Sequence, residues 1–153
     1  MVIVASVEAK TITLSRCSPT GMEDFEKNDF VIDLDNKITK HVMIYTDKAV
    51  EKYNQDPNKP GTKLASQKIT ILEYKILYSD NQYVKASRKI PIMENRPEFV
   101  QFDLDIDLKK KTLDQTSYIY IKNGLEKKNT IPFKCEKSSG GSGAKGVLDK
   151  ILK

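Results

Sequence analysis

The stretch FVQFDLDIDL, residues 99–108, constrains the fold of this chain more than any other feature. Every second residue from Val100 to Leu108 is apolar. The positions between them are polar, namely Gln101, Asp103, Asp105 and Asp107. Because successive side chains point to opposite faces of a β-strand, this spacing predicts a strand with one face on a core and the other in water.

Strand-like runs of this kind recur along the chain, separated by turn residues. We expect strands at 11–15, 30–35, 40–45, 67–78, 83–93, 117–122 and 130–136, in addition to 99–108. A helix is the rival interpretation of 64–78, because Leu72 and Ile76 are four residues apart. Residues 47–55 predict one short helix with Asp47 as its N-cap. A total of about eight to ten short strands predicts an all-β fold, either an antiparallel β-sandwich or a barrel.

The chain length of 153 residues is that of one compact domain followed by a tail. We assign 1–137 to the β-domain, 138–143 to a glycine- and serine-rich tether, and 144–153 to an amphipathic C-terminal arm. The arm gathers four apolar side chains on one helical face: Val147, Leu148, Ile151 and Leu152. A helix this short is not stable alone, so we expect these four residues to dock on another surface, either on this chain or on a partner.

Sequence motifs for catalysis are missing from this chain. His41 is the only histidine, and its neighbours ITKHVMIY place it in a strand, where a structural role is the simpler interpretation. The sequence has no zinc-protease, nucleophile-elbow or phosphate-loop motif. We therefore predict no enzyme activity, no cofactor and no metal site, with a carboxylate-based hydrolase as a minor alternative.

Charge is distributed unevenly, and residues 109–153 carry eleven lysines against four carboxylates. Turn lysines of this region are either simply solvated or form a basic rim that contacts an acidic partner: Lys109, Lys110, Lys111, Lys127 and Lys128. Asp103, Asp105 and Asp107 are interpreted as a solvated face paired with lysines, or as an acidic stripe along a channel. Arginine is scarce, which argues against specific nucleic-acid recognition.

The two cysteines, Cys17 and Cys135, are far apart in the sequence. Two buried thiols are the favoured interpretation, and a single disulfide between the first and last strands is the alternative. No apolar run approaches the ~20 residues that a membrane-spanning helix needs. Residues 1–10 predict a strand rather than a signal peptide, which favours cytoplasmic synthesis or an assembled particle.

These features together predict a non-enzymatic structural or assembly subunit of a homo-oligomer, such as a tube, a shell or a virion component. Its C-terminal arm would dock on a neighbouring subunit, so the expected partner is a second copy or another protein. The alternative is a monomeric β-sandwich module that binds a protein or a carbohydrate. In that case, the tail is an engineered linker plus peptide.

Overall fold

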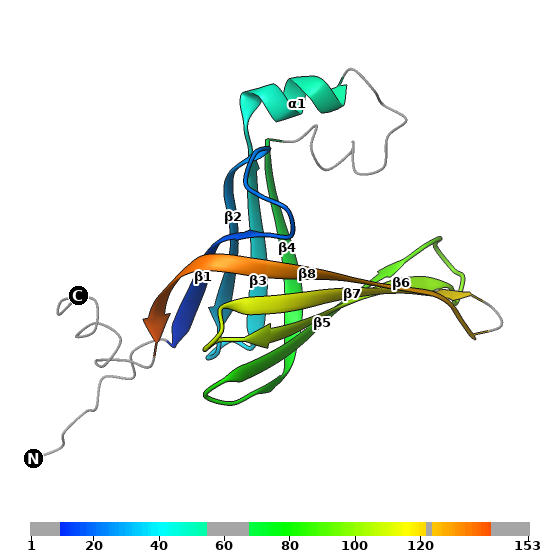
Figure 1. Ribbon diagram of the computed structural model, residues 1–153. Coiled ribbons are helices and arrows are strands. Elements are labelled where there is room, and N and C mark those ends of the chain that lie inside the picture. The colour runs from blue at the N-terminus through cyan, green and yellow to red at the C-terminus, as the bar shows by residue number, and fades with distance from the viewer. Residues whose placement is uncertain (1–9, 55–67, 122–123, 142–153) are drawn as a thin grey trace, which may run out of the picture.

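The computed structural model describes residues 10–54, 68–121 and 124–141, and it contains a closed antiparallel barrel (Figure 1). Each strand is hydrogen-bonded to the next one along the chain, and the last strand returns to the first. The elements are β1 Thr11–Ser18, β2 Phe25–Asp33, β3 Ile38–Tyr45, α1 Asp47–Asn54, β4 Ile69–Ser79, β5 Tyr83–Pro91, β6 Phe99–Asp107, β7 Thr112–Ile121 and β8 Gly124–Gly141. The all-β prediction is confirmed, and the barrel is the correct one of its two architectures.

Alternation along the strands builds the core of the barrel. In β6, Leu104 and Ile106 are buried while Asp105 between them is exposed, as the sequence predicts. In β4, Tyr74 and Ile76 are buried on the same face, so a period of two replaces the rival helical interpretation. The buried cluster consists of Leu14, Cys17, Phe30, Ile32, Tyr74, Ile76, Val84, Ala86, Leu104, Ile106, Leu113, Phe133 and Cys135.

The pairing of β1 with β8 closes the barrel and changes two expectations. Cys17 and Cys135 lie opposite each other in this ladder and form a disulfide, so the favoured interpretation of two separate thiols is wrong. Ser138–Gly141, the start of the predicted tether, is strand and pairs with Thr11–Leu14. The composition of this segment indicates a linker, but the edge of β1 offers it backbone hydrogen bonds that composition does not reveal.

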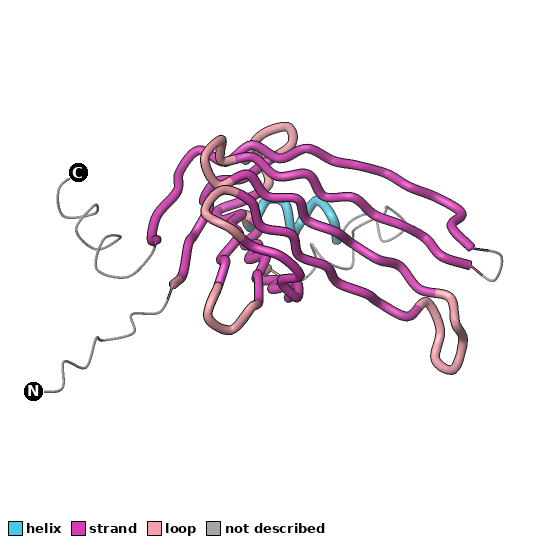
Figure 2. Tube along the Cα trace, turned by 90° about the horizontal axis from the view of Figure 1, so that it is seen from below, coloured by secondary structure: helices cyan, strands magenta, loops and turns pink. Residues whose placement is uncertain are grey.

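Two neighbouring pairs of strands, β4 with β5 and β1 with β2, separate toward the same end of the barrel. The β4–β5 ladder covers Lys75–Ser79, whereas the β5–β6 ladder continues to the pair of Pro91 and Phe99. On the other side, β1 is paired with β2 over Thr11–Leu14 and with β8 as far as Ser18. As a result, β2–β4 rise toward α1 while β5–β8 run out to one side in Figure 1. Figure 2 shows the long strands side by side in this extension.

The helix α1 covers the end of the β2–β4 sheet. The Oγ1 atom of Thr46 accepts a hydrogen bond from the backbone N–H of Ala49 at 3.1 Å, so Thr46 is the N-cap and the predicted N-cap, Asp47, is the first helical residue. Ala49 packs with Met43 and Tyr45 in a second, smaller core cluster. This cluster stabilises the part of the sheet that has left β5–β8.

Candidate functional site

A cavity of about 390 Å³ lies where β2–β4 part from β5–β8. Its walls come from strands of both groups and from the segment that joins β1 to β2. Large apolar side chains form much of the inner wall: Phe25, Met43, Leu72, Phe102 and Phe133. The cavity therefore offers an enclosed apolar volume with an opening at the end of the barrel.

His41 and Asn28 form a polar pair in the wall of this cavity. Nε2 of His41 lies 2.6 Å from Oδ1 of Asn28, and both side chains are buried. Because a carboxamide oxygen only accepts, Nε2 carries the proton and donates this hydrogen bond. In the part of the chain that the structure describes, Nδ1 of His41 is buried with no hydrogen-bond partner. The site thus has a buried lone pair that the protein itself leaves unused.

The surroundings of His41 keep its ring neutral. The ring stacks on Phe30 with a centroid distance of 4.1 Å and meets the edge of Phe133 at 6.3 Å. Burial among these rings lowers the pKa of His41 from an ordinary 6.5 to about 3. At neutral pH, His41 is therefore an uncharged polar group in an apolar wall and not a cation.

A second polar pair joins the opposite sheets across the cavity. Nε2 of Gln115 in β7 donates a hydrogen bond of 3.0 Å to the hydroxyl of Tyr74 in β4. Burial raises the pKa of Tyr74, and the hydrogen bond from Gln115 and the charge of Arg88 oppose that rise. Arg88 borders Tyr74 in a separate depression, next to Lys75 and Ser87, and it does not line the cavity.

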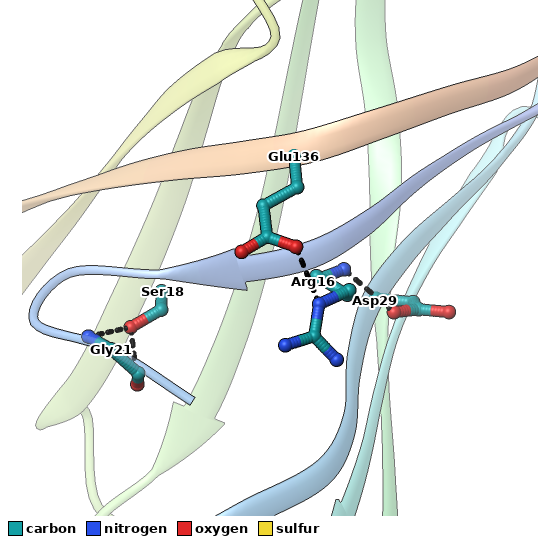
Figure 3. Close-up of polar contacts among 5 residues, drawn as sticks. All are labelled: Arg16, Ser18, Gly21, Asp29 and Glu136. Atoms are coloured by element: carbon teal, nitrogen blue, oxygen red, sulfur yellow. Dashed lines mark hydrogen bonds and ion pairs between the residues drawn. The ribbon is translucent and has the colours of Figure 1, made fainter. Parts of the chain in front are cut away.

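A tight turn after β1 begins the rim of the cavity. The hydroxyl of Ser18 accepts hydrogen bonds from the backbone N–H groups of Thr20, at 3.1 Å, and of Gly21. The same hydroxyl contacts the carbonyl of Gly21 at 2.5 Å, as Figure 3 shows. Pro19, Thr20 and Gly21 all line the cavity, so this local network holds one side of its opening.

The contacts of Arg16 fix the point at which β1 leaves β2. Its backbone N–H donates to Oδ1 of Asp29 at 3.1 Å, and its Nε lies 2.5 Å from Oε2 of Glu136 (Figure 3). Arg16 has a φ of 55°, a left-handed conformation that is uncommon outside glycine. This turn of the backbone accompanies the burial of both Leu14 and Cys17, which strict alternation would place on opposite faces.

Acidic side chains complete the rim. Glu23 and Asp24 both line the cavity, and the carbonyl of Asp24 accepts a hydrogen bond of 3.0 Å from the N–H of Thr46 at the start of α1. Among the described lining residues there is no lysine or arginine. Pro19 and Gly21 of the same rim also border the surface that carries Arg16, Lys109, Lys110 and Lys111.

The three aspartates of β6 do not converge on one point. Lys85 on the neighbouring strand lies 3.8 Å from Asp105, which agrees with a solvated face paired to lysine. Asp103 accepts hydrogen bonds from Ser87 and Gln101. Asp107 instead accepts from the backbone of the following turn, at Lys109 and Lys110. No group of three metal-ligating side chains occurs within 10–54, 68–121 and 124–141.

The five predicted rim lysines do not form one patch in the described structure. Lys109, Lys110 and Lys111 border a shallow surface near β1 together with Arg16. Lys128 lies over the ring of Tyr118 at 5.8 Å, about 20 Å further along the β7–β8 ladder at 3.4 Å per residue. The side chain of Lys127 is outside the described structure, as is the predicted docking set: Val147, Leu148, Ile151 and Leu152.

His41 lies in a strand, β3, as the sequence predicts, whereas the polar residues beside it were not predicted. Asn28 shares the inward face of β2 with Phe30 and Ile32, and Gln115 follows Leu113 on β7. A polar residue at an inward position of an alternating strand is the signal that could have found them. Their meeting in one cavity depends on barrel closure and could not be inferred.

No protein-family model matches this sequence, and no curated protein and no solved structure is significantly similar to it. The helix of the described chain, α1, has eight residues and is too short and polar to span a membrane.

Proposed function

We propose that this protein is a binding protein that holds a small, largely apolar molecule in the open end of its barrel. The observation that carries the proposal is the buried pair of His41 and Asn28 in the wall of a cavity that also has large apolar walls. Small-molecule sites typically measure about 300–1,000 Å³ and combine apolar walls with a few fixed polar groups. The cavity has both properties.

The energetics of the polar groups favour binding over a purely structural role. A buried polar group that makes no hydrogen bond costs about 1–3 kcal/mol in proteins. A core that served stability alone would be better filled by apolar side chains at positions 28, 41 and 115. A ligand-binding role explains these polar groups, because they would orient a ligand whose apolar surface is buried against the cavity walls.

We do not propose that the protein catalyses a reaction of the bound ligand. His41 contacts the amide of Asn28 and the rings of Phe30 and Phe133, none of which is a nucleophile. A neutral imidazole with these neighbours positions a ligand but has no side chain to activate. We therefore favour a carrier or sensor over an enzyme.

The test uses Nile red, an uncharged dye whose fluorescence rises in apolar surroundings. Leu72→Trp fills the cavity, and Leu77→Trp makes the same substitution on the same strand at a side chain that is 66% exposed. We expect wild type and Leu77→Trp to bind the dye with the same affinity and Leu72→Trp to lose at least tenfold. Equal binding by all three proteins, or no binding by wild type, would refute the proposal.

A second proposal, self-assembly, is favoured by a different observation. Ile69, Ile71 and Leu77 project from the outer face of β4 and are 57%, 54% and 66% exposed. Ile69 and Ile71 are adjacent on this face, and the exposed Glu73 and Lys75 separate them from Leu77. Exposed apolar groups that lie together are typical of a contact surface. We expect light scattering to detect an oligomer that Ile71→Lys weakens and that deletion of 144–153 weakens if the C-terminal arm contributes. A monomer at every accessible concentration would refute assembly without affecting ligand binding.

A further inference from the structure

We propose that the bound molecule is a lipid with one long hydrocarbon chain, which fills the cavity at one end and covers the inner face of the β5–β8 extension with the rest. This inference rests on the proposed binding function and specifies the class of ligand. The extension consists of the strand ends that run out beyond β2–β4 in Figure 1. Its inner face is defined by five apolar residues: Ile90, Val100, Phe102, Ile119 and Ile121.

Strand register places the residues of the inner face on one side of the sheet. Val100 lies opposite Ile90 on β5 and opposite Ile119 on β7, and directly opposite residues of antiparallel strands point to the same side. Phe102 shares this side because it is two residues from Val100 on β6. Leu104, two residues further along β6, is fully buried in the barrel core. The inner face is therefore the continuation of the core-facing side beyond the point where β2–β4 part from β5–β8.

This inner face is partly uncovered in the described structure. The side chains of Ile90 and Ile121 are each 36% exposed, and those of Val100 and Ile119 are half-buried. The strand β4 does not cover them, because the β4–β5 ladder ends at Ser87, before Ile90. Removal of this apolar surface from water is favourable, so the face can stabilise an apolar ligand that lies on it.

Phe102 belongs to both the cavity and the inner face. It lines the cavity together with Gln115, which lies one row deeper on β7. Val100 and Ile119 form the next row outward from Phe102, about 7 Å away at a rise of about 3.4 Å per residue. Ile121 is two residues beyond Ile119. A chain that leaves the cavity past Phe102 therefore meets apolar side chains over about another 14 Å.

The width of the inner face favours a single chain over a protein partner. Arg88 and Ser117 lie opposite Phe102 on its two sides, so the apolar path is one strand wide there, about 4.8 Å. Protein interfaces of standard size use about 20–30 residues from each partner, far more than the inner face provides. The cavity volume of about 390 Å³ is near the lower end of the range for small-molecule sites, so a long chain would extend past it onto the inner face.

The experiment is a calorimetric titration with two nonionic ligands, the octyl and hexadecyl ethers of octaethylene glycol, below their micelle concentrations. Both have the same uncharged head group, and the hexadecyl chain is twice as long. Each further buried CH₂ group strengthens binding about fourfold, so we expect the hexadecyl ether to bind wild type at least a hundredfold more tightly. Leu72→Trp, which fills the cavity, should weaken the binding of both ligands at least tenfold.

Two variants test the inner face separately from the cavity. Ile90→Asn and Ile119→Asn should weaken binding of the hexadecyl ether at least fivefold and leave binding of the octyl ether unchanged, because only the longer chain reaches their row. Leu125→Asn is the matched control and should leave both affinities unchanged. Leu125 is 53% exposed and lies opposite Tyr120, whose side chain points to the other face of the extension from that of Ile119.

The outcomes separate this inference from the binding function. If Nile red binds to wild type but all three asparagine variants keep the wild-type ratio of the two affinities, the inference about the chain is overturned and the binding function stands. A wild-type oligomer that Ile90→Asn dissociates in light scattering would also overturn it, because a second copy would then cover the inner face. The same holds if deletion of 144–153 strengthens binding of the hexadecyl ether. If Nile red does not bind to wild type, the binding function itself fails.

Discussion

Gly140 of β8 lies so close to the backbone of Thr11 in β1 that a Cβ atom on Gly140 would overlap the carbonyl oxygen of Thr11. The φ of Gly140 is 89°, which also favours glycine. Since this contact belongs to the ladder that closes the barrel, the glycine-rich segment is part of the fold.

Replacing Gly140 with alanine should therefore destabilise the barrel by about 2–3 kcal/mol, because the added methyl group meets rigid backbone. Gly124→Ala is the control: Gly124 also has a positive φ, of 108°, but no atom lies within 4 Å of the added Cβ. We expect it to cost only about 1 kcal/mol. Urea denaturation of both variants checks this, and equal losses would mean that the close approach has no energetic effect.

Reduction of the disulfide between Cys17 and Cys135 should lower the free energy of unfolding. The bridge links positions 118 residues apart, and closing a loop of this length contributes about 4–5 kcal/mol in the chain-entropy treatment. Thermal unfolding with and without a phosphine reductant measures the effect. The double variant Cys17→Ser, Cys135→Ser should be insensitive to the reductant, and a wild type that is equally insensitive would contradict the prediction.

Stability should fall in mild acid because of His41. Its folded-state pKa is lowered to about 3, so below pH 6.5 the unfolded chain takes up a proton that the folded chain does not. Above pH 6.5 the contribution of His41 to the free energy of unfolding is fully present. Below pH 6.5 this free energy decreases by up to about 1.4 kcal/mol for each pH unit. His41 is the only histidine, and the hydrogen-bonded carboxylates Asp33 and Asp80, whose pKa values are lowered, lose their contribution only below the ordinary value of 3.8.

Urea midpoints between pH 7 and 4.5 check this prediction. His41→Gln removes the titrating group and should flatten the pH dependence in that range. If wild type shows the same flat profile, then the imidazole is protonated in the folded state and the description of a neutral site is incorrect.

Replacing Thr39 is expected to leave the free energy of unfolding unchanged or to raise it. Its side chain is fully buried in β3, and its hydroxyl has no hydrogen-bond partner within the described structure. Thr39→Val should be neutral or stabilise the protein by about 1 kcal/mol, since it replaces an unsatisfied hydroxyl with a methyl group. Thr116→Val, which loses a hydrogen bond of 3.1 Å to Thr130, should destabilise it instead. Calorimetry of the two valine variants would refute this explanation if both moved in the same direction.

Local pattern was sufficient for most strands. The alternation of Val100 to Leu108 predicted β6, and the run around Leu72 predicted β4, because a period of two is written in neighbouring residues. The helix after β3 was also predicted, although its N-cap is Thr46 and not Asp47. In each case, the interactions that decide the structure lie within a few residues of each other.

The sequence by itself determined an all-β chain with alternating faces and one short helix. Only the tertiary structure decided that the strands close into a barrel, that Cys17 bonds to Cys135, that Ser138–Gly141 is strand, and that Asn28, His41, Tyr74 and Gln115 share one cavity. The physical reason is range: alternation is a property of adjacent residues, whereas these contacts form only when β8 meets β1 and the two groups of strands part at one end.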